Sequence, residues 1–115
     1  MNKKSFIWVT HNFEGFHNYP DAPDEVAFLR NEHRHMFHLK VWIEVFHDDR
    51  DIEFFMFKNF IKALIDIDSY DYMSCEMISD NLFEEITFKY PARDIKIDVS
   101  EDLENGSSIT YEVDK

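Results

Sequence analysis

The sequence predicts an α+β domain in which a four-stranded, largely antiparallel sheet carries two helices on one face. Two observations predict this class. Apolar side chains alternate with a period of two residues near both ends of the chain, and they follow a helical period in the middle. The expected order of elements is therefore strand, strand, helix, helix, strand, strand. Because the 115 residues contain no internal repeat, we expect a single domain over residues 1–115.

Two strands are expected in the first half, over residues 4–17 and 33–47. Most alternate side chains there are apolar or imidazole, so one face of each strand would be buried. Residues 18–32 join the strands and are rich in Pro, Asn and Asp, which is typical of turns, with a short helical turn expected over residues 25–30. The side chains expected on the buried face are Ile7, Val9, His11, Phe13, His17, His35, Phe37, Leu39, Val41, Ile43 and Val45.

Two helices are expected in the middle of the chain. Asp51 is the expected N-cap of the first and Ser74 of the second, because their side-chain oxygens can accept a free backbone N–H. The second helix should end before Pro91, which cannot continue a helix. The apolar stripes are Phe54, Phe57, Ile61 and Leu64 in the first helix, and Ile78, Leu82 and Ile86 in the second.

The last two strands are expected over residues 93–100 and 109–113, with a turn at Asn105 and Gly106 between them. Two hairpins flanking two helices would leave both edges of the sheet open. Open, apolar edges normally pair with another chain. We therefore expect a homo-oligomer in which sheets join edge to edge.

Composition limits the partners and the compartment. The formal net charge is −12, whereas phosphate backbones require clusters of Lys and Arg, so we expect no nucleic acid partner. No apolar run is long enough to span a bilayer and no signal peptide is recognisable, so we expect no membrane partner. The single cysteine, Cys75, excludes an internal disulfide and fits a reducing compartment. A cytoplasmic protein is the resulting prediction.

Three histidines stand out as a candidate metal site. His33 and His35 would point to the same face of a strand, because side chains repeat every two residues. His17, at the end of the preceding strand, could supply a third imidazole. Three protein ligands with one open position are typical of catalytic zinc. The alternative is that these are ordinary strand-end residues, since two histidines on one strand face are common.

Five short patterns follow one another in a familiar order. They are Phe-x-x-x-His at 13–17, His-x-His at 33–35, an acidic and aromatic helix entry at 51–58, Met-Ser-Cys-Glu at 73–76, and Ile-x-Val-x-Glu-Asp at 97–102 followed by Gly106 and Tyr111. Together they resemble the motifs of the tunnelling-fold (T-fold) enzymes 6-pyruvoyl-tetrahydropterin synthase and 6-carboxy-tetrahydropterin synthase. The resemblance spans residues 6–113. It implies the T-fold, in which ββααββ units assemble into a barrel.

The resemblance also implies a site and an activity. In this family three histidines bind zinc, which here would be His17, His33 and His35. A glutamate after the third strand anchors the amino-pyrimidinone edge of a pterin, here Glu101, because a carboxylate can accept two parallel hydrogen bonds. The implied protein is a trimeric or hexameric lyase acting on dihydroneopterin triphosphate at subunit interfaces. Further candidates for contacts with a pterin or nucleotide-like ligand are Cys75, Glu76 and Arg50.

Two catalytic positions depart from the family pattern. Leu29 stands where the family has a cysteine, about four residues before the His-x-His motif, and residues 65–72 contain no histidine for the family's Asp-His pair. Glu25 and Glu32 are the candidates for a substitute base, since some relatives use a carboxylate. Two further hypotheses stay open. One is a non-catalytic, phage-type binding protein that sequesters or senses a pterin, guanine derivative or signalling nucleotide; the other is a structural oligomer without a ligand.

Overall fold

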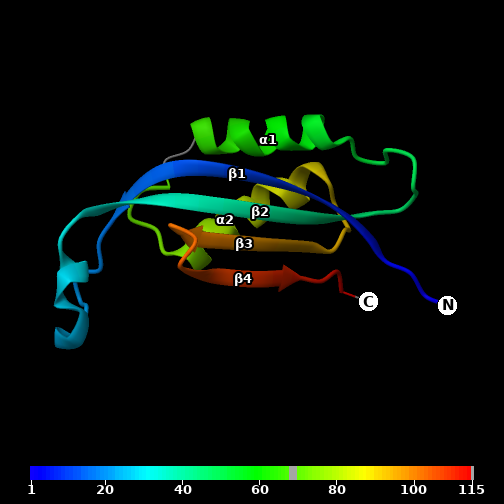
Figure 1. Cartoon of the computed structure of the whole chain (residues 1–115). Coiled ribbons are helices and arrows are strands. Elements are labelled where there is room, and N and C mark those ends of the chain that lie inside the picture. Colours follow the sequence, from blue (N-terminus) through cyan, green and yellow to red (C-terminus); the bar gives the residue numbers. More distant parts are fainter. Residues whose placement is uncertain (68–69, 115) are drawn as a thin grey trace.

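The computed structural model of the chain describes residues 1–67 and 70–114, and it has the expected α+β fold (Figure 1). The strands pair in the order β1-β2-β3-β4, and all neighbours are antiparallel. This ββααββ order is confirmed and is consistent with the tunnelling fold. The elements are β1 (Ser5–His17), the 3₁₀ segment η1 (Asp24–Arg30), β2 (His33–Val45), α1 (Phe54–Ile67), α2 (Cys75–Lys89), β3 (Ile95–Glu101) and β4 (Asn105–Tyr111).

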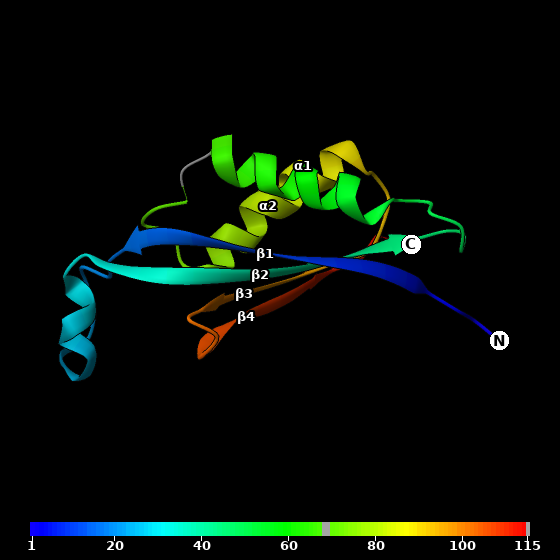
Figure 2. The same cartoon turned by 45° about the horizontal axis from the view of Figure 1, so that its top comes forward.

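Both helices lie on one face of the sheet, as Figure 2 shows. The alternation expected for β2 is confirmed, because its odd-numbered side chains from Phe37 to Ile43 are buried and face the core. Burial of these side chains away from water is the main stabilising contribution to such a domain. The fully buried core side chains are Phe37, Val41, Ile43, Phe57, Ile61, Ile78, Leu82, Ile86, Ile95, Ile97 and Val99.

The second helix begins and ends where expected. The hydroxyl of Ser74 accepts a hydrogen bond from the Met77 backbone N–H over 3.1 Å, which satisfies one of the free donors of the first turn. Helix α2 ends at Lys89, with Tyr90 as its C-cap directly before Pro91. Ser74 therefore anchors the start of α2 at the end of the sheet where β1 ends and β2 begins.

The prediction that Asp51 caps α1 is wrong. The helix starts at Phe54, and the carboxylate of Glu53 accepts the hydrogen bond from the Met56 N–H over 2.8 Å. Asp51 lies too early in the chain to reach the first turn. Its carboxylate instead accepts hydrogen bonds from the Phe46 N–H and the Arg93 guanidinium, over 2.7 and 2.8 Å.

The turn between β3 and β4 also differs from the prediction. The chain reverses at residues 102–104, and Asp102 and Leu103 have positive φ angles of 55° and 61°. Gly106 is instead part of β4, opposite Ser100. A Cβ at Gly106 would lie 2.3 Å from the Val99 carbonyl oxygen, so the glycine permits close strand pairing and does not form the turn.

Strands β1 and β4 form the two edges of the sheet, and β1 is nearly twice as long as β4. The chain between β1 and β2, including η1, projects beyond the end of the helical layer (Figure 1). Within the described residues, no helix combines the length and apolar character needed to cross a membrane.

Candidate metal and ligand site

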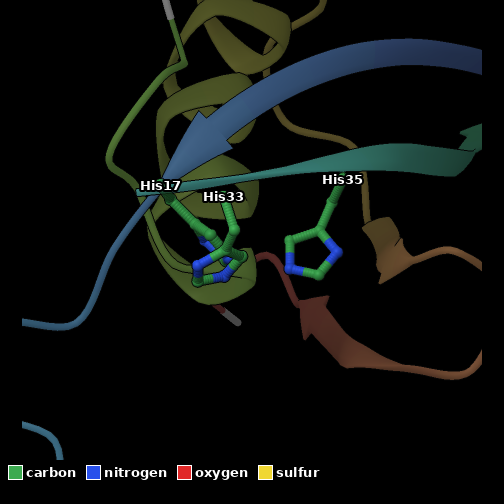
Figure 3. A group of neighbouring side chains, drawn as sticks. All are labelled: His17, His33 and His35. Atoms are coloured by element: carbon green, nitrogen blue, oxygen red, sulfur yellow. The ribbon is translucent and has the colours of Figure 1, made fainter. Parts of the chain in front are cut away.

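The three candidate histidines meet at one end of the sheet (Figure 3). His17 is the last residue of β1 and His33 the first of β2, and the two are direct cross-strand partners. His35 lies two residues further along β2, opposite Gly15. The alternation of β2 places His33 and His35 on the face that also buries Phe37, as expected from their spacing.

The three imidazole rings converge on a common point. Their centroids are separated by 4.5 Å for His17–His33, 4.8 Å for His17–His35 and 4.7 Å for His33–His35. The ring planes are steeply inclined to one another, by 72° to 88°. One nitrogen from each ring lies within 4.8 Å of the others, so these three side chains could hold a metal ion.

The outer nitrogens of two rings are held by the protein. Nδ1 of His33 donates a hydrogen bond to the Asn31 carbonyl over 2.8 Å, and Nδ1 of His35 donates to the Asp102 carboxylate over 2.7 Å. A neutral imidazole that donates through Nδ1 carries its lone pair on Nε2. Both Nε2 atoms are buried and have no hydrogen-bond partner within residues 1–67 and 70–114. Leaving such an atom unsatisfied is costly, and a metal ion bound at Nε2 would satisfy it. The residues present fit a zinc ion of the three-histidine class.

Glu101 lies directly beside the histidine cluster. One carboxylate oxygen is 3.4 Å from Nε2 of His17, and the other is 3.5 Å from Nε2 of His35. Burial lowers the pKa of His17, and Glu101 partly opposes that effect. His17 is therefore kept in the neutral form that a metal requires.

Cys75 is the third neighbour of Glu101, with its thiol sulfur 4.0 Å from a carboxylate oxygen. Burial, together with the negative charges of Glu101 and Glu76, raises the pKa of the Cys75 thiol to about 11. The thiol thus stays protonated at neutral pH. It can donate a weak hydrogen bond to Glu101, but it is a poor nucleophile or base.

A cavity of about 520 Å³ opens beside the histidines. Its polar end holds His17, His33 and Glu101, and its walls carry apolar and aromatic side chains. Leu29, which replaces the expected cysteine, is one of the wall residues. The other lining residues are Asn18, Tyr19, Tyr72, Met73, Ser74, Cys75, Glu76, Met77, Asn105 and Gly106.

The remaining candidates lie at different distances from this cavity. Glu76 lines it, and Glu32 accepts a hydrogen bond from the hydroxyl of Tyr72, which also lines it. Glu25 is exposed within η1 and is not among the lining residues. Arg50 lies beyond the opposite end of β2, where its guanidinium contacts Asp49 over 2.7 Å. The structure thus brings Glu76 to the histidines and leaves Arg50 far from them within one chain.

No protein-family model matches the sequence, and no curated protein matches it significantly. The chemistry of the site therefore follows from its own side chains. Three imidazoles, one carboxylate and an adjoining, mostly apolar cavity can hold a metal ion next to a small ring compound.

Sequence reasoning missed two residues of this site. Asp102 orients His35, and Gly15 leaves space for the Phe37 ring that packs against His17 and His35. Asp102 is one of 24 acidic residues, so composition does not single it out. Its position directly after Glu101, in a turn next to the histidine pair, was the available signal.

Proposed function

We propose that the chain is a divergent member of the T-fold pterin synthase family that binds zinc and a pterin or purine-type ring. The observation that carries this proposal is the pair of buried Nε2 atoms, on His33 and His35, that have no hydrogen-bond partner among the described residues, with the Glu101 carboxylate 3.5 Å from the His35 atom. Without a metal, the described residues offer the His33 atom no hydrogen bond and place only the Glu101 carboxylate near the His35 atom. A metal ion accounts for both atoms.

His17, His33 and His35 would hold the zinc ion. When bound in this way, zinc polarises a carbonyl or hydroxyl oxygen of a ligand. Glu101 would accept hydrogen bonds from adjacent ring N–H and amino donors, because an ionised carboxylate offers two acceptor oxygens in one plane. The apolar wall of the cavity would enclose the ring and exclude water from it.

Turnover would require a group that moves protons near the ligand. For the lyase acting on dihydroneopterin triphosphate, Glu32 is the candidate base, because it is linked through the Tyr72 hydroxyl to the cavity. The second candidate function is a binding protein that sequesters or senses a pterin, guanine derivative or signalling nucleotide. It is favoured by Leu29, an inert side chain in the cavity wall, and by the protonated thiol of Cys75.

A homo-oligomer completes the proposal. Strands β1 and β4 each have one unpaired edge, and large apolar side chains beside β1 are exposed. Joining sheets at these edges would produce the trimer or hexamer that the family resemblance implies. The exposed apolar side chains that line a groove between β1 and the start of α1 are Phe6, Trp8, Phe54 and Phe55.

The first experiment is elemental analysis of purified protein prepared without chelators. We expect about one zinc ion per chain, retained in His38→Ala and lost in the His33→Ala/His35→Ala double variant. His38 is the matched control because it lies on the opposite face of β2. A wild-type protein that binds no zinc even when zinc is added would contradict the metal site.

A substitution at Glu101 tests ring binding separately from zinc binding. Glu101→Gln removes the negative charge but keeps the size of the side chain. We expect it to retain zinc and to lose most of its affinity for 7,8-dihydroneopterin in calorimetric titrations, because the amide presents only one acceptor. Equal affinity in the wild type and the variant would contradict the role of Glu101.

A further inference from the structure

Carboxylates surround the cavity beside the histidines. Glu101 and Glu76 line it, and Glu32 is bonded to the hydroxyl of Tyr72 in its wall. Asp102 lies against the outer side of His35. A zinc dication held by three neutral imidazoles would balance two of these charges, Glu101 and Asp102, which lie next to the histidines. No lysine or arginine among the described lining residues would balance Glu76 and Glu32, so the cavity stays negative even with the metal in place.

The arginines at this end of the sheet are directed elsewhere. None of the described lining residues is a lysine or an arginine. Arg30 binds the Ala22 carbonyl at 2.6 and 2.9 Å and the Asp24 carboxylate at 2.8 Å, all within the segment around η1. Arg34 stands between the two metal-site histidines in sequence, but strand alternation places it on the opposite face, 3.5 Å from Glu14. Neither guanidinium is available to a ligand of the cavity.

The start of helix α2 also faces the cavity, and helix N-termini often bind phosphate. Here one of the first-turn donors is already used, because the Ser74 hydroxyl accepts from the Met77 N–H over 3.1 Å. Glu76 places a negative charge in the first turn, where it complements the positive end of the helix dipole and would repel a phosphate.

Apolar and aromatic side chains also line the cavity. They are Tyr19, Leu29, Tyr72, Met73 and Met77, and the volume of about 520 Å³ suits a bicyclic ring with a short side chain. A neutral ring with N–H donors would meet the Glu101 carboxylate at one end and apolar contacts at the other. A triphosphate would meet carboxylates without a countercharge.

From this charge distribution we infer that the cavity selects an unphosphorylated pterin or purine-type compound and discriminates against its phosphorylated forms. The inference rests on the proposed ring-binding function and narrows its ligand class. It also separates the two candidate functions, because a lyase acting on dihydroneopterin triphosphate must accept the triphosphate, whereas a binding protein for a free base or unphosphorylated pterin need not.

The test compares matched ligands on the zinc-loaded full chain by isothermal titration calorimetry. The pairs are 7,8-dihydroneopterin with its triphosphate, and guanosine with GTP. We expect the unphosphorylated member of a pair to bind at least about tenfold more tightly at low ionic strength, because like charges a few ångströms apart repel strongly in a partly dry cavity. Added salt should reduce the difference in affinity between the two members of a pair, because it screens the charges.

Two outcomes would overturn the inference in distinguishable ways. If the triphosphate binds more tightly, the inference fails while the ring-binding function stands, and cations from another copy of the chain must complete the cavity. If neither member of either pair binds, the ring-binding function and the inference fail together.

A charge-reversal variant tests whether the carboxylates of the cavity cause the preference for the unphosphorylated ligand. Glu76→Lys should shift the preference toward the triphosphate by about tenfold or more, since it replaces a repulsive charge with an attractive one. Glu85→Lys makes the same change in net charge about 14 Å further along α2 and should leave the preference unchanged. Equal shifts in both variants would assign the effect to net charge and overturn the inference.

Discussion

Asp102 connects the β3–β4 turn to the metal-site histidine His35. One oxygen of its carboxylate accepts a hydrogen bond from Nδ1 of His35 over 2.7 Å, and the other accepts from the Met36 N–H over 3.0 Å. The Asp102 N–H donates to the Met36 carbonyl over 2.8 Å. These contacts lower the pKa of Asp102, the His35 bond most of all. The carboxylate is thereby fixed on the outer side of the ring, and Nε2 of His35 points inward.

This contact predicts that Asp102→Ala weakens zinc binding without removing a ligand. Without the carboxylate, the His35 ring can rotate and exchange its tautomer. Loss of such an outer partner typically reduces metal affinity by about 10- to 100-fold. Competition with a chromophoric chelator measures this affinity. Glu104→Ala, in the same turn but without a contact to the histidines, is the control, and equal affinities in the two variants would contradict the role of Asp102.

A second prediction concerns Gly15, which lies opposite His35. A Cβ at this position would lie 2.6 Å from the Phe37 ring, and Phe37 is fully buried against the rings of His17 and His35. Gly15→Ala should therefore destabilise the domain by about 1–3 kcal/mol, the usual cost of overpacking. It should also weaken zinc binding, because the displaced Phe37 ring packs against His17 and His35.

Urea unfolding of the apo and zinc-loaded forms measures both effects. The double variant Gly15→Ala/Phe37→Leu provides the control, because the smaller leucine relieves the clash. Its loss of stability should be smaller than the sum of the two single losses, as expected for residues in contact. Additive losses would show that the methyl group and the ring do not compete for space.

The sequence predicted the elements well because their apolar periods are clear. Each strand of the core alternates, and each helix carries a stripe, so burial alone specifies their type and facing sides. The start of α1 at Phe54, with Glu53 accepting the first-turn hydrogen bond, was not predictable in the same way. Asp51 has the better capping side chain, but its carboxylate accepts hydrogen bonds from the Phe46 N–H and the Arg93 guanidinium. Arg93 is 42 residues away in the sequence, so local patterns do not reveal this contact.

Part of the candidate site was predictable because it also follows from strand alternation and strand pairing. Strand alternation placed His33 and His35 together, and antiparallel pairing placed His17 beside them. Asp102 and Gly15 act through contacts across strands that depend on a turn with positive φ and on the packing of one aromatic ring. No local sequence pattern encodes such contacts. From the sequence alone, Asp102 and Gly15 therefore cannot be distinguished from the other acidic residues and from Gly106.

The third prediction concerns the pH dependence of stability. The Arg93 guanidinium, followed by the Phe46 N–H, lowers the pKa of Asp51 below its ordinary value of 3.8. The unfolded chain therefore takes up a proton at Asp51 before the folded chain does. The stabilising contribution of Asp51 is complete well above pH 3.8, and it is lost as the pH falls from that value through the folded-state pKa.

Chemical unfolding measured at a series of acidic pH values tests this. The difference in unfolding free energy between the wild type and Asp51→Asn should be constant near neutral pH and should shrink below pH 3.8. Asp49→Asn, which removes a neighbouring carboxylate whose contact is an exposed arginine, is the charge-matched control. A wild-type minus Asp51→Asn difference that does not change with pH would contradict the assignment.

The last prediction concerns the exposed edge of β1. Phe55 is 72% exposed and Trp8 is 53% exposed, and together with Phe6 and Phe54 they line a groove of about 430 Å³ between β1 and the start of α1. An unpaired strand with adjoining aromatic side chains is the surface that a second copy of the chain would cover. Phe55→Asp should therefore shift the protein from oligomer to monomer, because it places a charge in that interface.

Light scattering coupled to size-exclusion chromatography gives the mass of each variant. The control is Phe88→Asp, since Phe88 is 88% exposed near the end of α2 and is not part of the groove. It carries the same chemical change and should keep the wild-type mass. If both variants lower the mass equally, the interface is not specific to β1. If the wild type is itself monomeric, edge-to-edge assembly is excluded, and the cavity beside His17, His33 and His35 must act within a single chain.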